Sequence, residues 1–418
     1  MVSRHRRLPK NVYKLTKTLL LIRMQEEVYL VDFKRTAFSR ARPNDPDRDV
    51  FNSIRMDEAL GLLIKDSLNR TGIKPADIGD VIIGSALQAD ENWLYGGRHP
   101  VFMAGLPFSV PSMALDRACA SSMNAIAIGA MEIMTGNSGI VMAGGMEHMT
   151  HVPLSNNPHI KPNMKLLLRP EYSKYEMATS YNMGLTAEKL ARMKGISRED
   201  MDKFSVESHR KAAAAKDSGY FKEEILPVEV ERGGSMVTID SDQSIRPDTS
   251  LEALKSLQPA FTNNGVITAG NSSPLNSGAS LAVLMSTSKV KEYGLKPMAK
   301  ISGQAWAAVD PSVMGLGPVP ASRKLLEKNG LKVDDIDLWE INEAFAVVVI
   351  NAIRDLAIDP EKVNIHGGAI SIGHPLGATG ARIVGTLARE LKEKKKEKGI
   401  ATLCVGGGQG FSILVEAV

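Results

Sequence analysis

Three residues of this chain combine a reactive side chain with a position at the start of a helix or the end of a strand. Cys119 opens a segment, residues 119–131, that carries no charged side chain, and His374 stands in a Gly-His-Pro turn before another expected helix. Cys404, the second of only two cysteines, ends an apolar strand and precedes three glycines. These residue types predict covalent chemistry on a thiol, with an imidazole that activates the thiol and donates to an oxyanion.

The position of Cys119 also predicts an acidic thiol. Because a helix start combines a positive dipole end with unpaired amides, it favours the thiolate over a thiol with a pKa of about 8.5. For an arbitrary cysteine, packing as a small buried hydrophobe is the commoner role, and Cys404 before its glycine turn has the same alternative. The helix start and the presence of a second such cysteine favour chemistry for Cys119.

The two halves of the chain repeat one order of elements. Residues 72–84 predict a helix stop, a turn and a β-branched strand, and residues 330–342 repeat that pattern after another helix. Cys119 and His374 are each followed by a predicted helix, a glycine, a strand and a glycine turn. An internal duplication therefore predicts an α/β protein of two packed units, each with a reactive residue at a loop-to-helix junction.

Asn342 follows the repeated strand of the second half. Active-site loops of α/β folds gather at strand ends, so this position favours a role in the site. An ordinary turn asparagine is the alternative.

The segment between the halves differs in composition. It holds more proline, lysine and methionine, and Ser197 begins an expected amphipathic helix. We interpret it as an insertion that forms a cap over the site. The predicted domains are a basic extension at 1–24, an N-terminal domain at 25–149 and 273–296, the inserted cap at 150–272, and a C-terminal domain at 297–418.

The formal charge of +4 comes from the N-terminal tail. Residues 1–24 carry seven Lys and Arg and no acid, so the remainder holds 44 basic and 47 acidic residues, a net charge of −3. This balance argues against a nucleic-acid-binding body. The tail fits an organelle transit peptide, but we favour a disordered extension, or an upstream start codon with Met24 as the true beginning.

The composition also argues against several other classes of protein. No apolar run reaches the length of about 18 residues that a membrane helix needs. Two cysteines without a Cys-x-x-Cys pair argue against a disulfide framework and against a structural zinc site. We therefore expect a soluble protein in a reducing compartment.

With these features in one order, the chain from about residue 28 to residue 418 resembles the thiolases, which transfer an acyl group between coenzyme A and an acyl-CoA carbon. The resemblance rests on seven motifs. They are Asp116-Arg117-Ala118-Cys119-Ala120-Ser121-Ser122, Gly144-Gly145-Met146-Glu147-His148-Met149, Met183-Gly184-Leu185-Thr186-Ala187-Glu188, Thr268-Ala269-Gly270-Asn271-Ser272-Ser273, Asn342-Glu343-Ala344-Phe345, Gly373-His374-Pro375 and Cys404-Val405-Gly406-Gly407-Gly408.

The resemblance implies a thiolase fold of two duplicated βαβαβαββ halves in α-β-α-β-α layers. It implies that Cys119 takes the acyl group from a 3-ketoacyl-CoA after activation by His374, while Cys404 moves the proton of the acetyl carbon. His374 and a water held by Asn342 would stabilise the enolate oxygen. The amides of Cys119 and Gly406 would bind the tetrahedral oxyanion.

The resemblance further implies that Ser273 contacts coenzyme A and that Met183, Met314 and Phe345 line the acyl or pantetheine pocket. For the methionines, ordinary packing is the alternative. Coenzyme A is expected as a substrate, with no permanently bound cofactor and no metal. A homodimer or homotetramer is expected, with a β-oxidation partner subunit as an option. The expected location is cytoplasmic, or mitochondrial if the tail is a transit peptide.

Chain length and direction stay open at this stage. Asn182 stands where short-chain synthetic thiolases often have histidine, and residues 146–153 are closer to the degradative long-chain type, whereas the C-terminal half looks like acetoacetyl-CoA thiolases. Ketoacyl and hydroxymethylglutaryl-CoA synthases share a cysteine nucleophile but lack a cysteine in the role of Cys404. A non-catalytic lipid-carrier or scaffold subunit would typically lose the Asn-Glu-Ala-Phe motif or a reactive cysteine.

Overall fold

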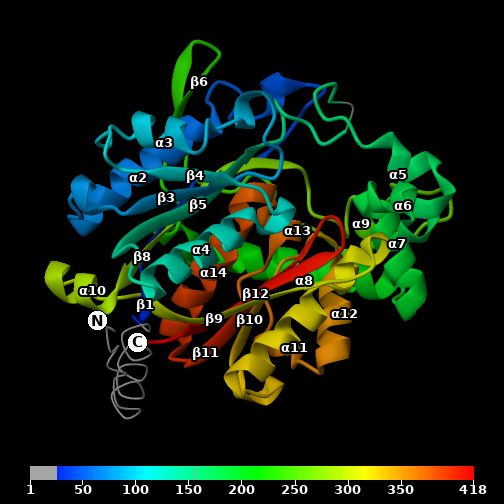
Figure 1. The fold of residues 1–418 in the computed structure, drawn as a ribbon. Helices are drawn as coiled ribbons and strands as arrows, with labels where there is room; N and C mark the ends of the chain where they lie inside the picture. Colours follow the sequence, from blue (N-terminus) through cyan, green and yellow to red (C-terminus); the bar gives the residue numbers. More distant parts are fainter. Residues whose placement is uncertain (1–25, 156) are drawn as a thin grey trace, which may run out of the picture.

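The computed structural model describes residues 26–155 and 157–418, so the basic tail predicted at 1–24 lies outside the described residues (Figure 1). The strands are β1 (Val28–Arg35), β2 (Ser39–Arg40), β3 (Asp80–Gly84), β4 (Ser112–Leu115), β5 (Ile140–His148), β6 (Val228–Arg232), β7 (Ser235–Ile239), β8 (Asn276–Ser286), β9 (Ala299–Ala308), β10 (Leu338–Ile341), β11 (Lys398–Val405) and β12 (Gln409–Glu416).

The helices are α2 (Met56–Thr71), α3 (Arg98–Met103), α4 (Ser121–Met134), α5 (Met164–Leu168), α6 (Met177–Ser180), α7 (Met183–Lys194), α8 (Arg198–Asp217), α9 (Leu251–Lys255), α10 (Thr287–Tyr293), α11 (Pro318–Asn329), α12 (Ala346–Leu356), α13 (Ala369–Ile372) and α14 (Leu376–Lys394). Among the described residues, no helix is both long and apolar enough to cross a membrane.

One mixed sheet runs through both halves of the chain, in the order β10-β11-β12-β9-β1-β8-β5-β3-β4, with β2 paired to β8. In the first half, parallel strands β4, β3 and β5 are followed by antiparallel β8 and β1. In the second, parallel β10 and β11 are followed by antiparallel β12 and β9. Strands β1 and β9 meet antiparallel at the centre. The predicted α/β fold of two similar halves is therefore confirmed.

The second half differs at the position that corresponds to β4. There, a single parallel bridge joins Trp339 to Val363 in place of a strand. The chain turns away immediately afterwards, because Asn364 adopts a φ of +45°. The side chain of Asn364 then continues the pairing, since its Oδ1 accepts from the Ile341 amide at 2.8 Å and its Nδ2 donates to the Ile341 carbonyl at 2.9 Å.

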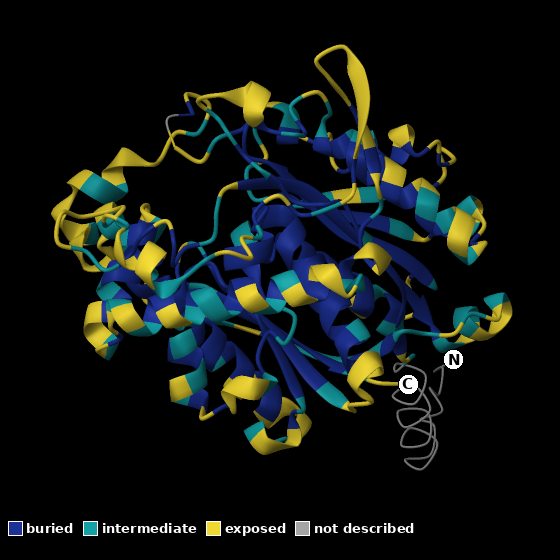
Figure 2. Cartoon of the chain, turned by 180° about the vertical axis from the view of Figure 1, so that it is seen from behind, coloured by how far each residue is buried: buried dark blue, intermediate teal, exposed yellow. Residues whose placement is uncertain are grey.

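The helices and the two halves of the sheet form layers, and the apolar faces of each helix determine its layer. Helices α4 and α14 lie between the two halves of the sheet, while α2 and α3 cover one outer face and α11 and α12 cover the other (Figure 1). One buried cluster joins apolar side chains of α4 and α14 to strands of both halves. Because α4 carries no charge on most of its length, it can be buried on all sides. Figure 2 shows this buried centre and the exposed rim of the molecule.

The segment between β5 and β8 holds helices α5 to α9 and the separate hairpin β6-β7. Helix α8 begins where the sequence predicted it, with the Ser197 side chain accepting from the Asp200 amide at 3.1 Å. Buried Arg35, at the end of β1, holds this segment to the sheet. Its guanidinium donates to Glu224 at 3.0 Å and to both oxygens of Asp242 at 2.7 and 2.9 Å. The predicted bounds of the cap stay a prediction.

We predict that Arg35→Ala lowers the free energy of unfolding by about 3–5 kcal/mol, because it leaves Asp242 buried without its cation and leaves Glu224 with Arg389 alone. Urea unfolding followed by circular dichroism measures the change. Arg48→Ala is the matched control, since Arg48 pairs with Asp45 at 3.7 Å in a largely exposed position, and it should change the value by less than about 0.5 kcal/mol. A loss below about 1 kcal/mol for Arg35→Ala would contradict this account of the cap.

Candidate active site

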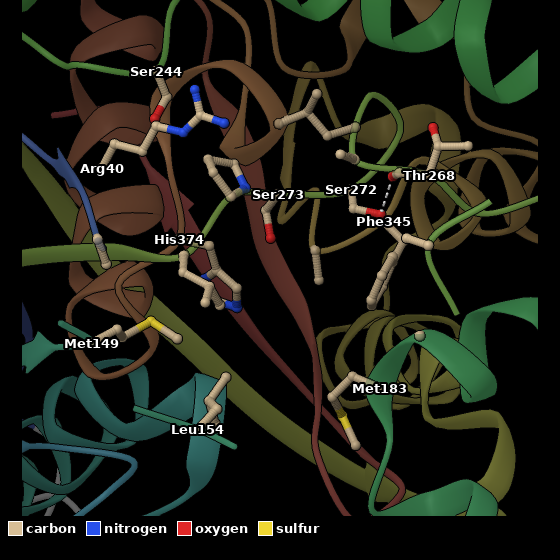
Figure 3. A pocket seen from close by; sticks show the side chains of 18 of the residues that line it. Arg40, Met149, Leu154, Met183, Ser244, Thr268, Ser272, Ser273, Phe345 and His374 are labelled. Atoms are coloured by element: carbon tan, nitrogen blue, oxygen red, sulfur yellow. Dashed lines mark hydrogen bonds between the residues drawn. The ribbon is translucent and has the colours of Figure 1, made fainter. Parts of the chain in front are cut away.

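A cavity of about 860 Å³ opens between the two halves and the inserted segment. It brings together residues that lie almost 300 positions apart in the sequence, and Figure 3 shows part of its wall. Seven of the nine predicted site residues line it. They are Cys119, Met183, Ser273, Met314, Phe345, His374 and Cys404.

Cys119 lies in a tight turn that directly precedes α4. The sequence predicted that Cys119 opens the helix, whereas the structure places it in the 3₁₀ turn Ala118–Ala120, two residues before α4 begins at Ser121. Ala118 has a φ of +42°, an uncommon conformation for a residue with a side chain. The turn is held by Asp116, whose Oδ1 accepts from the Ala118 amide at 2.6 Å, and by Ser121, whose hydroxyl donates to the Ala118 carbonyl at 2.7 Å. Such local strain is often retained at functional sites.

The prediction of an acidic Cys119 thiol is wrong for the free protein. Burial raises the pKa of Cys119 to about 11; the Gly406 amide, which donates to the sulfur, lowers it, and the nearby Glu147 raises it further. Removal of water from the sulfur therefore outweighs the helix start. Cys119 stays protonated near neutral pH until a base accepts its proton.

The neighbours of His374 determine which nitrogen of its imidazole carries the proton. Its Nδ1 lies 2.6 Å from the Thr379 hydroxyl, and that hydroxyl donates to the Pro375 carbonyl at 2.8 Å. Because the hydroxyl has one hydrogen, it must accept from Nδ1–H, which leaves Nε2 as the unprotonated nitrogen. Burial lowers the pKa of His374 to about 3, and the cation of Arg382 lowers it further, so the imidazole is neutral at physiological pH.

Asn342 lies beside His374 at the end of β10. Its Nδ2 is 3.4 Å from His374 Nε2, and its backbone amide donates to the Thr402 carbonyl at 2.9 Å. Within the described residues, the buried Oδ1 of Asn342 has no hydrogen-bond partner. A buried amide oxygen of this kind needs a partner such as a bound water or a substrate group.

Cys404 and Gly406 lie where β11 ends. Cys404 is buried, and burial together with the neighbouring Cys119 raises the pKa of its thiol strongly. Gly406 stands between the inserted segment and the Cys119 turn: a Cβ placed on it would lie 3.7 Å from Met183 Sδ and 3.8 Å from Ala118 Cβ. Of the five predicted catalytic residues, Cys119, His374 and Cys404 therefore line the cavity, while Asn342 contacts His374 and Gly406 lies beside the Cys119 turn.

The four predicted substrate contacts also line the cavity. The amide of Ser273 donates to the Ala344 carbonyl at 3.0 Å, which ties the loop before β8 to the Asn-Glu-Ala-Phe segment. The ring of Phe345 packs edge-on against Phe261, with centroids 6.2 Å apart. Met314 is buried with Cys404 and Phe345 in one apolar cluster, and Met183 packs at its edge. The methionines thus pack and line the cavity at the same time.

The structure adds residues that sequence reasoning missed. Thr379 fixes the tautomer of His374, and its position five residues after His374, at the start of the same expected helix, was an available signal. Asn276 carried no local signal, because it meets the loop only in the fold: its Oδ1 accepts from the His374 amide at 2.8 Å and its Nδ2 donates to the Ser39 carbonyl at 2.6 Å. The cavity wall is also strongly basic. Its charged residues are Arg40, Arg42, Arg48, Arg246 and a single acid, Asp45.

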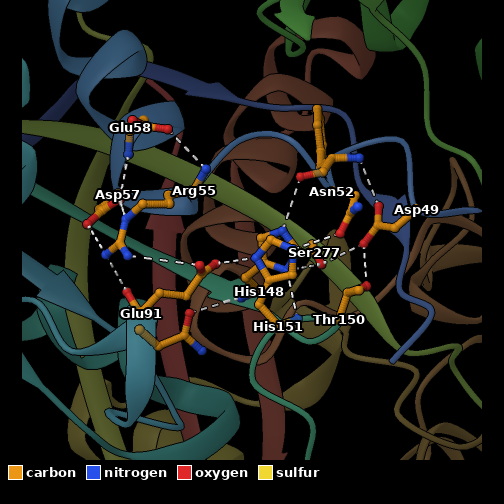
Figure 4. Close-up of polar contacts among 12 residues, drawn as sticks. Asp49, Asn52, Arg55, Asp57, Glu58, Glu91, His148, Thr150, His151 and Ser277 are labelled. Atoms are coloured by element: carbon orange, nitrogen blue, oxygen red, sulfur yellow. Dashed lines mark hydrogen bonds and ion pairs between the residues drawn. The ribbon is translucent and has the colours of Figure 1, made fainter. Parts of the chain in front are cut away.

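A second polar cluster contains three side chains of metal-binding types (Figure 4). Ligand atoms of Glu91, His148 and His151 lie within 4.8 Å of one another. The two imidazoles are stacked, with centroids 3.7 Å apart and an interplanar angle of 8°. A metal lies close to the plane of each imidazole that binds it, at about 2.0–2.1 Å, so two stacked rings suit a shared ion poorly.

The nitrogens of this cluster already have protein partners. His151 contacts Glu91 at 2.7 Å through Nδ1 and Asn52 at 2.9 Å through Nε2, and the Glu91 contact raises the pKa of His151. His148 contacts the Phe51 carbonyl and the Ser277 hydroxyl, each at 3.2 Å. We interpret the cluster as a structural support of the cavity wall.

We predict that His374 does not titrate between pH 5 and pH 8 in the free protein. Burial depresses the pKa of a histidine, so the neutral form persists as the pH falls until about pH 3. Nitrogen-15 NMR of histidine-labelled protein should show a single tautomer protonated at Nδ1. In Thr379→Val the tautomer preference should be lost. A titration midpoint of 6 to 7 for His374 in the wild-type protein would contradict the assignment.

Comparisons with known proteins agree on one family. Residues 28–288 match the family model described as "Thiolase, N-terminal domain", and residues 295–417 match "Thiolase, C-terminal domain". The chain is 42% identical over 398 residues to a 3-ketoacyl-CoA thiolase of Saccharophagus degradans, covering 94% of this chain and 98% of that protein. It is 41% identical to an acetyl-CoA acetyltransferase of Chromobacterium violaceum, covering 85% of this chain and 92% of the relative.

Solved structures give the same result. The crystal structure of human mitochondrial 3-ketoacyl-CoA thiolase matches with a TM-score of 0.84 at 33% identity, covering 94% of this chain and all of that one. The Bacillus anthracis acetyl-CoA acetyltransferase matches with a TM-score of 0.83 at 36% identity, covering 95% of this chain and all of that one. Both family models, these relatives and the duplicated fold show that the chain belongs to the thiolase family.

Proposed function

We propose that this protein is an active thiolase. It cleaves a 3-ketoacyl-CoA with coenzyme A into acetyl-CoA and a shortened acyl-CoA, or catalyses the reverse Claisen condensation, through an acyl-Cys119 intermediate. The observation that carries this proposal is the cavity itself, in which two cysteines and an unprotonated imidazole meet. A carrier or scaffold subunit would not need two thiols and a base in contact with one pocket.

In the first half-reaction, His374 Nε2 accepts the proton of the Cys119 thiol as the sulfur attacks the 3-keto carbon. This transfer converts a neutral thiol and imidazole into a thiolate and an imidazolium, and burial disfavours that ion pair in the free protein. The thiolate is used up as soon as it forms the bond to the 3-keto carbon. The amides of Cys119 and Gly406 bind the tetrahedral oxyanion. Collapse of that intermediate breaks the bond between the α- and β-carbons and leaves the acyl group on Cys119.

The bond cleavage releases acetyl-CoA as its enolate. The α-carbon of this enolate must take up a proton to give acetyl-CoA. Cys404 supplies that proton, since burial keeps its thiol protonated. The enolate oxygen is stabilised by His374, which carries the proton taken from Cys119, and by a water held by Asn342. In the second half-reaction, the Cys404 thiolate accepts the proton of the coenzyme A thiol, and that sulfur attacks the acyl-Cys119 thioester. Cys119 leaves as the acyl-CoA forms and regains its proton from His374.

Coenzyme A is a substrate here, and no permanently bound cofactor is required by these steps. Ser273 contacts its pantetheine part, and Met183, Met314 and Phe345 form the walls around the thioester. The basic wall suits an anionic substrate, because four arginines face one acid there. A single aspartate cannot neutralise that charge, so the cavity attracts a ligand that carries phosphates.

The acyl side of the pocket favours a chain longer than acetyl. Ala41, Met149 and Leu376 form a small apolar cluster that packs against Cys119, and Leu154 extends the wall beyond it. Apolar surface of this kind gains free energy with each buried methylene, about 0.8 kcal/mol. Because some relatives are acetyl-CoA acetyltransferases, a short-chain acetoacetyl-CoA thiolase that works mainly in condensation is the second candidate.

We also propose that the protein forms a homodimer through the open edge of its sheet. Strand β4 ends the sheet, and apolar side chains gather around it: Phe108 is 91% exposed, Tyr95 60% and Trp93 53%. An unpaired edge beside such side chains suits a second copy of the chain. A homotetramer or a β-oxidation partner subunit remain the alternatives that size measurement in solution distinguishes. We propose a cytoplasmic location, or a mitochondrial one if residues 1–24 are a transit peptide.

We predict that Cys119→Ser abolishes thiolysis, with a loss of at least about 10³-fold in kcat, because the hydroxyl is a far weaker nucleophile than the thiol. Consumption of acetoacetyl-CoA and of longer 3-ketoacyl-CoAs in the presence of coenzyme A measures the loss. Thermal unfolding should match the wild type. Retention of full activity would refute the nucleophile assignment.

Cys404→Ala separates the two thiols. We predict that acetyl-CoA still acetylates Cys119 in this variant, which mass spectrometry of the intact protein detects, while condensation and thiolysis stop. If both steps survive, the acid/base role of Cys404 is wrong. If neither survives in a correctly folded variant, the two cysteines cannot be assigned separate roles.

A comparison of kcat/KM across 3-ketoacyl-CoAs of rising length decides between the two candidate functions. We predict a rise beyond the four-carbon substrate, because the apolar cluster beside Cys119 contacts the growing chain. A maximum at acetoacetyl-CoA would instead favour the short-chain candidate. Met149→Ala should weaken the preference for longer chains.

A further inference from the structure

The two halves of the molecule touch backbone to backbone beside the cavity. A Cβ on Gly145 would lie 2.1 Å from the Gly377 carbonyl oxygen, and a Cβ on Gly377 would lie 2.3 Å from the Met146 carbonyl oxygen. Only glycine permits this approach. The first turn of α14, which follows His374, is therefore pressed against strand β5, which leads away from the Cys119 helix.

Glu147 lies at this seam and is fully buried. Its Oε1 accepts from the Ser85 hydroxyl at 3.1 Å, the Leu87 amide at 3.1 Å and the Asn92 side chain at 2.9 Å. Its Oε2 accepts from the amides of Ala86 and Gly377, each at 2.8 Å. Four of these five donors belong to the first half of the chain, and Gly377 belongs to the second.

The bond to Gly377 completes the start of α14. The first amides of a helix have no partner within the helix, and the residue that precedes α14, Pro375, offers no side-chain cap. Glu147 supplies one from the other half, where a carboxylate also interacts favourably with the helix dipole. His374 is two residues before this helix. By holding the helix start, the Glu147 carboxylate therefore fixes the position of the His374 loop relative to β5.

The same carboxylate supports the Cys119 turn. It holds the segment Ser85–Leu87, which continues from Gly84 at the end of β3. A Cβ on Gly84 would lie 2.4 Å from the Ser121 carbonyl carbon, so this segment packs directly against the start of α4. One buried side chain thus contacts the supports of both the sulfur and the imidazole.

We propose that Glu147 is a positioning residue of the acyl-transfer step, which sets the distance between Cys119 and His374 by holding the Ser85–Leu87 loop and the start of α14 on one carboxylate. This inference rests on the proposed thiolase function, which gives the two side chains their joint task. A displacement of about 1 Å between reacting groups can cost on the order of 10²-fold in rate.

The charge of Glu147 has a second effect. Burial raises the pKa of Glu147 to about 7, so the group is ionised in the alkaline range where Cys119 titrates, and its charge opposes formation of the thiolate. Position and charge can therefore be tested apart. Glu147→Asp keeps the charge and shortens the reach, whereas Glu147→Gln keeps the length, removes the charge and presents an NH₂ group to two donors.

The test uses full-length protein and three readouts. Both variants should lose 10- to 100-fold in kcat for thiolysis, with KM for coenzyme A changed by less than about threefold. The rate of Cys119 alkylation by iodoacetamide at pH 8.5 should rise about threefold or more in Glu147→Gln, because loss of a nearby anion lowers the pKa of the thiol. In Glu147→Asp that rate should stay within about twofold of the wild type.

Hydrogen exchange of the peptide that contains Gly377 is the third readout. The Gly377 amide should be protected in the wild type and should exchange at least tenfold faster in both Glu147 variants. Ser85→Ala is the matched control, because it removes one donor and leaves the carboxylate and the Gly377 bond in place. Its kcat should stay within about twofold of the wild-type value.

The proposal is overturned if Glu147→Gln keeps wild-type turnover, or if Gly377 exchanges equally fast in all proteins. If Glu147→Gln fails to fold, Glu147→Asp decides: wild-type kcat in that variant overturns the proposal. An unchanged alkylation rate in folded Glu147→Gln would overturn the effect of the Glu147 charge on Cys119. Alkylation and exchange need no turnover, so an inactive wild-type protein would reject the proposed function and leave these two readouts interpretable.

Discussion

The burial of two helices between the halves of one sheet is the constraint on which the site depends. Helices α4 and α14 have strands of both halves against them, and apolar side chains from all these elements form one cluster. A charge on such a helix needs a partner, as Arg382 of α14 has in Glu340 at 2.7 Å, whereas the first turn can open onto a cavity. The fold therefore brings the starts of both helices, with Cys119 and His374, to the same end of the central layer.

Desolvation explains the electrostatics of the site better than any single neighbour. The same removal of water raises the pKa of Cys119 to about 11 and lowers that of His374 to about 3. Both groups are consequently neutral at rest, and Thr379 keeps the free nitrogen of the imidazole on Nε2. The proposed chemistry thus starts from a neutral thiol and a neutral imidazole that are largely shielded from solvent, where donors aimed at a developing anion act strongly.

Much of this arrangement could be predicted from the sequence, because the informative signals are local. The repeated order of helix, glycine and strand predicted the duplication, and the absence of charge in residues 119–131 predicted a buried helix. The acidity of Cys119 was predicted wrongly, since a helix start is visible in the sequence while the extent of burial is a property of the whole fold. Asn276 was missed for a similar reason: only the pairing of β2 with β8 places it against the His374 loop.

The inserted segment leaves and re-enters the sheet through two neighbouring strands. Strands β5 and β8 are antiparallel partners, and His148 at the end of one lies opposite Ser277 near the start of the other. More than 100 residues are thus inserted between two strands that pair as in a hairpin, so the first and last residues of the insertion lie side by side. Because these two ends lie side by side, a change in the length of this segment would not by itself shift the register of β5 against β8.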